Sequence, residues 1–144
     1  MVQAPNPFSA PAVTGLNDTS PPGFVDVHFD YTFDAAMLAG ASWRDQQIPM
    51  ENDSDFVWRG ACYTDIIAGA FNYRFKDAQG YDLSSGMVSN GNLSNEPSSP
   101  TPIFPELVIP AGGAIRLDLD NVSGIPIQIQ FKLIGVKRYR VARG

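Results

Sequence analysis

Carboxylates are the most abundant side chains in this sequence that could do chemistry, with 15 Asp and Glu residues against one His and one Cys. Asp26 and Asp30 share one face of a predicted strand, and Asp118 and Asp120 share one face of another. Paired carboxylates can act as acid and base in glycoside hydrolysis or bind calcium. Any solvated strand shows the same spacing, and no calcium loop surrounds these residues, so we expect surface aspartates. A small β-barrel hydrolase is an alternative that requires two carboxyl groups about 5 to 9.5 Å apart in a cleft.

The single histidine and the single cysteine form no recognisable catalytic or metal-binding pattern. A cupin-type metal site needs several imidazoles, and His28 lies alone on the polar face of a predicted strand. Ser-His-Asp catalysis has no Gly-x-Ser-x-Gly elbow to support it. Cys62 lies in an apolar stretch, where we expect a small buried side chain. The sequence therefore predicts a protein that is not an enzyme, with no catalytic residue, no metal site and no cofactor.

The two tryptophans are the residues best suited to stacking on a sugar ring. Trp43 and Trp58 could support a glycan-binding module together with nearby aspartates. Both lie in apolar strand contexts, however, so the sequence favours burial in the core. Exposed tryptophans would favour the glycan-binding alternative, and buried ones would weaken it.

The net charge of −5 conceals an asymmetry along the chain. Residues 132–144 contain five basic and no acidic residues, so residues 1–131 carry five positive and 15 negative charges. An acidic body does not suit general nucleic-acid binding, where basic surface dominates the affinity. The basic segment suits docking on an acidic protein surface or on a neighbouring copy, although a solvated edge strand protected by its charges would look the same.

Alternation of apolar and polar residues predicts a protein made of short strands. We expect a hairpin of 114–120 and 125–133, with 121–124 as its turn and one wet and one apolar face. Residues 34–39 form either a single helical turn or a bulged link. The other predicted strands are 24–33, 42–49, 55–68 (or two strands broken near Gly60), 71–76, 81–83 and 103–109. This pattern predicts an all-β chain, with an antiparallel β-sandwich or a barrel as the fold.

The proline-rich N-terminus predicts a second structural part. Residues 1–22 contain five prolines and read as an extended arm, in which Phe8 and Leu16 supply apolar contacts. Residues 23–144 then form a single β-sandwich domain with an exposed loop at 84–102 and the basic C-terminal segment. The chain has no apolar run long enough to span a membrane and no secretory signal at its N-terminus.

Several stretches of the sequence, taken in order, point to a known family. They are residues 47–59 (QIPMENDSDFVWR), the proline-rich loop, residues 104–116 (FPELVIPAGGAIR) and residues 131–139 (FKLIGVKRY). Over roughly residues 40 to 140 this order resembles the jelly-roll cementing or decoration proteins on the outside of tailed-bacteriophage capsids. The resemblance implies a jelly-roll-like sandwich that packs on the major capsid protein lattice and reinforces the shell, often as dimers or trimers. It supplies no individual site residue.

We therefore expect a non-enzymatic virion structural protein on the capsid exterior, made in the bacterial host cytoplasm. Its partners would be the major capsid protein and copies of itself, as a homodimer or homotrimer, without direct nucleic-acid or membrane contact. The alternative is a glycan- or receptor-binding β-sandwich module of a phage tail or head-to-tail joint. The predicted partner-contact residues are Phe8, Leu16, Lys137, Arg138, Arg140 and Arg143.

Overall fold

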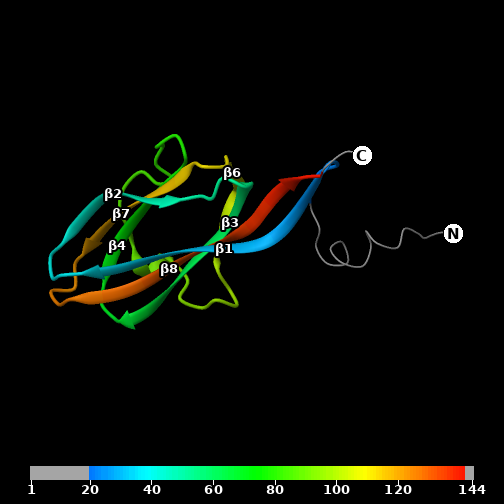
Figure 1. Cartoon of the computed structure of the whole chain (residues 1–144). Helices are drawn as coiled ribbons and strands as arrows, with labels where there is room; N and C mark the ends of the chain where they lie inside the picture. Colours follow the sequence, from blue (N-terminus) through cyan, green and yellow to red (C-terminus); the bar gives the residue numbers. More distant parts are fainter. Residues whose placement is uncertain (1–19, 142–144) are drawn as a thin grey trace.

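Two four-stranded sheets make up residues 20–141, the part of the chain that the computed structural model describes. The first sheet has the order β1 (Phe24–Met37), β8 (Ile127–Arg140), β3 (Asp55–Ile67) and β6 (Thr101–Ile109). The second has the order β2 (Ser42–Pro49), β7 (Ala114–Asn121), β4 (Phe71–Lys76) and β5 (Val88–Ser89). A short 3-10 helix, η2 (Asn90–Asn92), follows β5. All paired strands are antiparallel, which confirms the predicted all-β antiparallel sandwich (Figure 1).

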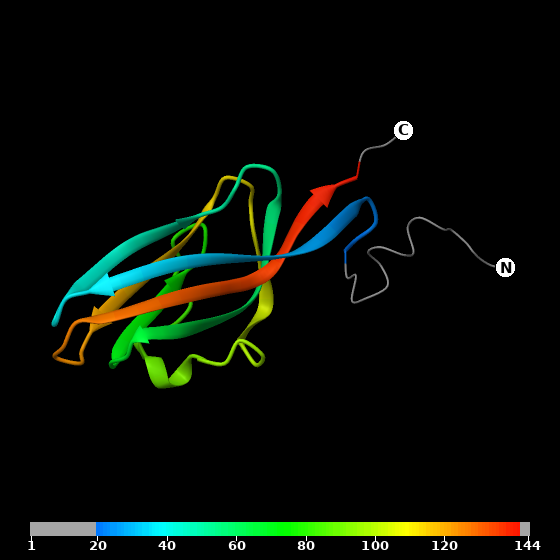
Figure 2. The ribbon, with the colours of Figure 1, turned by 60° about the horizontal axis from the view of Figure 1, so that its bottom comes forward.

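The strands pair in a nested order. β1 pairs with β8, β2 with β7, β3 with β6 and β4 with β5. This is the pairing of one long hairpin, centred on the β4–β5 connection, that has folded over into two sheets. Figure 2 shows β1 and β8 side by side along the molecule, although more than 80 residues separate them in the sequence.

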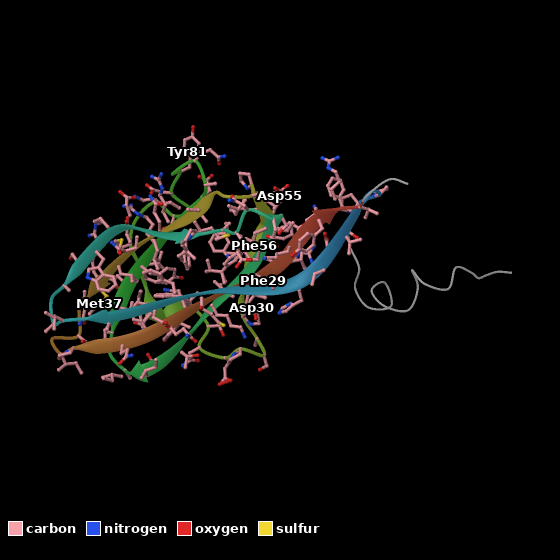
Figure 3. All side chains as sticks on the ribbon, in the orientation of Figure 1. Phe29, Asp30, Met37, Asp55, Phe56 and Tyr81 are labelled. Carbon is pink, nitrogen blue, oxygen red and sulfur yellow. The ribbon has the colours of Figure 1, made fainter. Side chains whose placement is uncertain are left out.

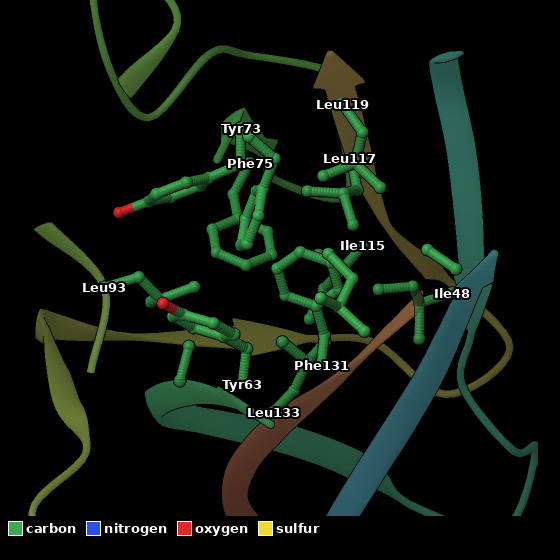
Figure 4. Packing of buried hydrophobic residues seen from close by; sticks show 14 of the residues in the cluster. Ile48, Tyr63, Tyr73, Phe75, Leu93, Ile115, Leu117, Leu119, Phe131 and Leu133 are labelled. Carbon is green, nitrogen blue, oxygen red and sulfur yellow. The ribbon is translucent and has the colours of Figure 1, made fainter. Parts of the chain in front are cut away.

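The hydrophobic core lies between the sheets and comes from alternate residues of each strand. Along β8, Ile127, Ile129, Phe131 and Leu133 are all buried, as the period of two predicts. The Phe131 ring packs edge-to-face against Phe75 of the facing sheet. Figure 4 shows the labelled core residues Ile48, Tyr63, Tyr73, Phe75, Leu93, Ile115, Leu117, Leu119, Phe131 and Leu133.

The predicted hairpin of 114–120 and 125–133 is wrong. The two segments are strands, but β7 pairs with β2 and β4, whereas β8 pairs with β1 and β3 in the other sheet. Residues 122–126 therefore cross from one sheet to the other instead of making a tight turn. The apolar face of each strand was predicted well because it follows from the alternation within the strand itself. The identity of the neighbouring strands does not follow from that alternation.

Strand lengths also differ from the predictions in two places. β1 continues in unbroken register to Met37, so residues 34–39 form neither a helical turn nor a bulged link. Residues 55–67 form one strand, which confirms the single-strand alternative for 55–68, with register shifts near Gly60 and between Asp65 and Ile67. The short strand predicted at 81–83 is only an isolated bridge between Lys76 and Asp82, and the partner of β4 is β5.

The basic C-terminal segment belongs to strand β8 as far as Arg140 and is not a free tail there. β8 extends to Arg140 because β1 pairs with it along its whole length, whereas β3 pairs with it only as far as Arg138. The predicted N-terminal arm lies outside the described residues except for 20–22. Residues 84–102, predicted as one exposed loop, contain β5, η2 and the first two residues of β6. About half of these residues are exposed, and Leu93 inserts into the core.

Candidate interaction surface

Asp118 is fully buried on the outer side of β7, so its predicted surface position is wrong. Arg74 Nη2 and Lys76 Nζ lie 3.2 and 3.5 Å from one carboxylate oxygen, and the backbone N–H of Asp45 donates to the other at 2.9 Å. Burial by itself would raise the pKa of Asp118, but the donated hydrogen bonds and the nearby cations hold it below its ordinary value. A bulge in β2 places Asp45 over this carboxylate.

The other paired aspartates also have cationic partners. Arg44 forms hydrogen bonds of 2.8 and 3.3 Å to the two oxygens of Asp120 and lowers the pKa of that carboxyl. Arg138 forms hydrogen bonds of 2.8 and 2.9 Å to Asp26. Both aspartates of the Asp118 and Asp120 pair therefore carry lowered pKa values, because each is bound by cationic side chains or hydrogen-bond donors of the chain itself.

His28 and Cys62 occupy unrelated environments. The side chain of His28 is 70% exposed, and its Nε2 lies 3.1 Å from an oxygen of Asp30. Cys62 is buried, and burial raises the pKa of its thiol. Across residues 20–141, no group of three or more His, Cys, Asp and Glu side chains could hold a metal ion.

The two tryptophans do not form an exposed stacking platform. Trp58 is completely buried, and its indole N–H donates to the carbonyl of Gly60 at 2.9 Å. Its ring packs edge-to-face against Phe75. Trp43 is partly buried against the core cluster. This burial weakens the glycan-binding alternative, which requires exposed tryptophans.

The predicted basic contact residues have different environments. Lys137 is only 4% exposed, and Arg138 is bound to Asp26 within the first sheet. Arg140 is exposed and lies over the Phe24 ring at 5.4 Å. Phe8, Leu16 and Arg143 lie outside the described residues. Lys137 and Arg138 thus neutralise carboxylates of the chain itself, and the contact role of all six residues stays a prediction.

Lys137 is the centre of what we call the charged end of the sandwich, formed by Glu51, Asp53, Lys137 and Tyr139. Its Nζ contacts Glu51, lies 3.2 Å from both oxygens of Asp53, and sits 4.1 Å from the centre of the Phe29 ring. The Tyr139 hydroxyl donates to Asp53 at 3.0 Å. Burial alone would lower the pKa of Lys137, but the bound carboxylates outweigh burial and raise it. The charges at this end are therefore satisfied within the molecule.

The opposite end of the sandwich exposes aliphatic side chains. They come from three segments, which are the β1–β2 loop at 38–41, residues 66–70 at the end of β3 and in the loop to β4, and the β7–β8 crossing at 122–126. None of the residues in these three segments is charged. The exposed side chains, which we call the apolar end, are Leu38, Ile66, Ile67, Val122 and Ile125, each between 50% and 75% exposed. Figure 3 labels Met37 at this end and Asp55 at the opposite end.

The buried side chain of Asn121 joins two of the three segments of the apolar end, and a backbone hydrogen bond joins the third. Its Nδ2 donates to the carbonyls of Leu38 and Ile125 at 3.0 and 2.7 Å, which ties the first loop to the crossing. The backbone N–H of Val122 donates to the carbonyl of Ala70 at 3.2 Å, which ties in the third. The polar groups of the loops thus point inward to one another, and the aliphatic groups point outward.

The sequence contained only a weak signal for this surface. Each loop is a short run of small and aliphatic residues that reads as a turn, and nothing in the sequence places the three side by side. The hydrogen bonds between the segments bring their exposed aliphatic side chains to the same end of the sandwich.

A second, smaller apolar feature lies along β6. A shallow pocket of about 290 Å³ is lined by Leu83, Pro102, Ile103, Phe104, Pro105 and Leu107. The Phe104 side chain is 93% exposed beside it. Its lining has no charged side chain and no convergent polar group that would orient a small substrate.

Comparison with known proteins assigns no family to the chain, because no protein-family model and no curated protein matches it. No helix among residues 20–141 is long and apolar enough to cross a membrane. The functional argument therefore depends on the surfaces described above.

Proposed function

We propose that this chain is a non-enzymatic virion structural protein that binds the outer surface of a tailed-phage capsid and cements neighbouring major capsid subunits. The observation that carries the proposal is the apolar end, an uncharged surface of five exposed aliphatic side chains. Such a surface favours adhesion to another protein over chemistry on a small substrate. The resemblance over residues 40 to 140 suggests the capsid shell as that protein.

The nested strand order supports the same proposal. Eight antiparallel strands in two sheets, paired first with last and so on inward, have the order of a jelly roll. We assign the fold to this type, which is common in viral capsid proteins. A rigid sandwich can present the same surface to each capsid subunit, and contacts repeated over a lattice add avidity.

In this proposal the major capsid protein is the main partner, and the protein acts on the virion exterior after synthesis in the host cytoplasm. Phe8, Leu16, Arg140 and Arg143 are proposed as additional contacts. Arg140 pairs with Phe24, at the end of β1 and β8 opposite to the apolar end, so its contact would be separate from that of the apolar end. Lys137 and Arg138 would contribute indirectly, since Arg138 binds Asp26 within the first sheet and Lys137 binds the loop that precedes β3.

The test is co-sedimentation of the full-length protein with empty capsid shells of the phage that encodes it. The wild-type protein should bind saturably. Leu38→Asp adds a charge to the most exposed side chain of the apolar end and should weaken binding at least tenfold. Tyr81→Asp is the matched control, since Tyr81 is also an exposed apolar side chain but lies elsewhere on the molecule (Figure 3).

Two results would contradict this proposal. Absence of binding by the wild-type protein would overturn the cementing function. Equal binding by the wild-type and Leu38→Asp proteins would show that the apolar end is not the contact surface. A glycan screen of the wild-type protein would then test the tail-module alternative directly.

A further inference from the structure

The four edge strands of the sandwich differ in how they are protected from pairing with other strands. β1 and β6 are the edges of the first sheet, and β2 and β5 are the edges of the second. An edge strand exposes unpaired N–H and C=O groups, and proteins usually block such edges with prolines, bulges, charges or short strands.

Three of the four edges carry such a block. β6 contains Pro102 and Pro105, which cannot donate to an added strand. β2 ends at Pro49 and is bulged, with Asp45 at a φ of 53°. β5 has only two residues. These three edges are therefore poor templates for a further strand.

β1 carries none of these blocks. It has 14 residues, without proline or lysine, and pairs with β8 in continuous register from Phe24 to Met37. Within residues 20–141, no strand pairs with its outer edge. We propose that β1 pairs antiparallel with β1 of a second copy, so that the first sheets of two copies join across a two-fold axis. This surface is separate from the apolar end, and the inference does not depend on the cementing function.

The aspartates of β1 do not protect its outer edge, because each is bound to β8 on the inner side. Asp26 binds Arg138, and Asp30 lies 3.3 Å from Lys132. Asp34 accepts a hydrogen bond of 2.9 Å from the amide of Gln130. The positively ionisable side chain of β1 itself is the exposed His28.

Charge complementarity identifies a second copy as the occupant and limits the register. An axis through Phe29 places His28 of each copy opposite Asp30 of the other, and Asp26 opposite Thr32. An axis one residue earlier places Asp26 opposite Asp30, and an axis one residue later places Asp30 opposite Asp30. Both axes oppose like charges, which is unfavourable. The apolar row that includes Val27 stays on one face in all three registers.

Axes through Val27 or Tyr31 would place His28 opposite Asp26 or Asp34 instead of Asp30. The environment of the Asp30 carboxylate favours the axis through Phe29. Its Oδ1 is buried without a hydrogen-bond partner within the described structure. His28 of the same chain lies 3.1 Å away, but its geometry is not that of a hydrogen bond. In the proposed register the imidazole of the second copy lies opposite this carboxylate. The pairing would also cover Val27, which is about half exposed.

The first test is sedimentation velocity of the full-length protein over a range of concentrations. The wild-type protein should dimerise. His28→Asp, which places Asp opposite Asp30, should raise the dimer dissociation constant at least tenfold, whereas the matched variant His28→Lys should leave it unchanged or lower it. The exposure of His28 makes both variants compatible with the fold. A wild-type monomer at all concentrations, or equal dimerisation of the two variants, would overturn the proposal.

The second test measures the register. A nitroxide is attached to Thr32→Cys in a Cys62→Ala background, and the distance between the two labels of a dimer is measured by electron paramagnetic resonance. With the axis at Phe29, the two labelled positions are six residues apart along the paired strands, or about 20 Å. A distance near 20 Å supports the register, and a much shorter or longer one contradicts it.

Discussion

The two ends of the sandwich satisfy their polar groups in opposite ways. At the charged end, Lys137 is buried beneath Glu51 and Asp53, and the ionic groups bind one another at the surface. At the apolar end, Asn121 binds the loop carbonyls from within, and aliphatic groups such as Leu38 face outward. The charged end has little left to offer a partner, whereas the apolar end has surface that gains from being covered.

This difference shows that clustered charge along a sequence is a poor guide to a binding surface. The basic C-terminal segment has the strongest charge asymmetry of the chain, yet Lys137 and Arg138 are used for internal pairs. Uncharged loops, in contrast, have no internal partner for their side chains. Four predictions test how far this contrast extends.

The largest effect is expected from Asn121→Ala at the apolar end. This substitution removes the donor to the carbonyls of Leu38 and Ile125 and the acceptor for the hydroxyl of Ser123. Leaving such groups unpaired and partly buried should lower the free energy of unfolding by about 2–3 kcal/mol. Urea denaturation followed by tryptophan fluorescence measures this change.

Ser123→Ala is the control for Asn121→Ala. It removes a more exposed hydroxyl whose bonds are confined to the same turn, and should cost less than about 1 kcal/mol. If Asn121→Ala proved as stable as the wild-type protein, the bonds of Asn121 to the 38–41 loop and the 122–126 crossing would not stabilise this end.

At the charged end, Lys137→Met should lower the free energy of unfolding by about 1–2 kcal/mol at pH 7. Methionine keeps much of the buried stem but loses the contacts with Glu51 and Asp53 and the cation over Phe29. The effect is smaller than for a fully buried ion pair because the two carboxylates are about half exposed and can be hydrated.

Lys132→Met is the matched control, since it changes another lysine of β8. Lys132 is more exposed and lies near one carboxylate, that of Asp30. We expect a loss within about 0.5 kcal/mol. An equal loss in the two variants would show that the cluster around Lys137 has no special stabilising role.

The third prediction concerns the stability of the charged end at low pH. The pKa of Asp53 is lowered because hydrogen bonds from Lys137 and Tyr139 outweigh the effect of burial. A lowered pKa stabilises the fold above the ordinary value of about 3.9, and this stabilisation is lost as the pH falls through the folded-state pKa. The deficit of Lys137→Met should therefore shrink between pH 7 and pH 3, whereas that of Asn121→Ala should not. Urea titrations at both pH values test this, and equal shrinkage in both variants would contradict it.

Local patterns predicted much of the fold. The alternation in β7 and β8 identified their buried faces, and it also contained a signal for Lys137, which occupies the apolar phase that begins at Ile127. The pairing of β1 with β8 was not predictable, because no local pattern reports a contact between such distant segments. The false hairpin arose because adjacent strands were assumed to pair.

The candidate surfaces were harder to predict than the fold. Asp118 has the alternation of a wet-face residue and is buried because the bulge in β2 covers it with Asp45. The apolar end depends on three loops that only the folded chain brings together. The free edge of β1 likewise requires knowledge of the strand order.

The smallest change in stability is expected from Leu38→Ser, and it tests whether the apolar end is surface or core. Leu38 is 75% exposed, so the substitution should change the free energy of unfolding by less than about 0.5 kcal/mol. Ile127→Ser, at the same end but buried, should cost several times more, about 2–5 kcal/mol, as for other large core truncations. Urea denaturation of both variants decides whether the apolar end is surface or core. A loss above about 1 kcal/mol for Leu38→Ser would mean that Leu38 stabilises the folded monomer, and its exposure would then no longer argue for a partner.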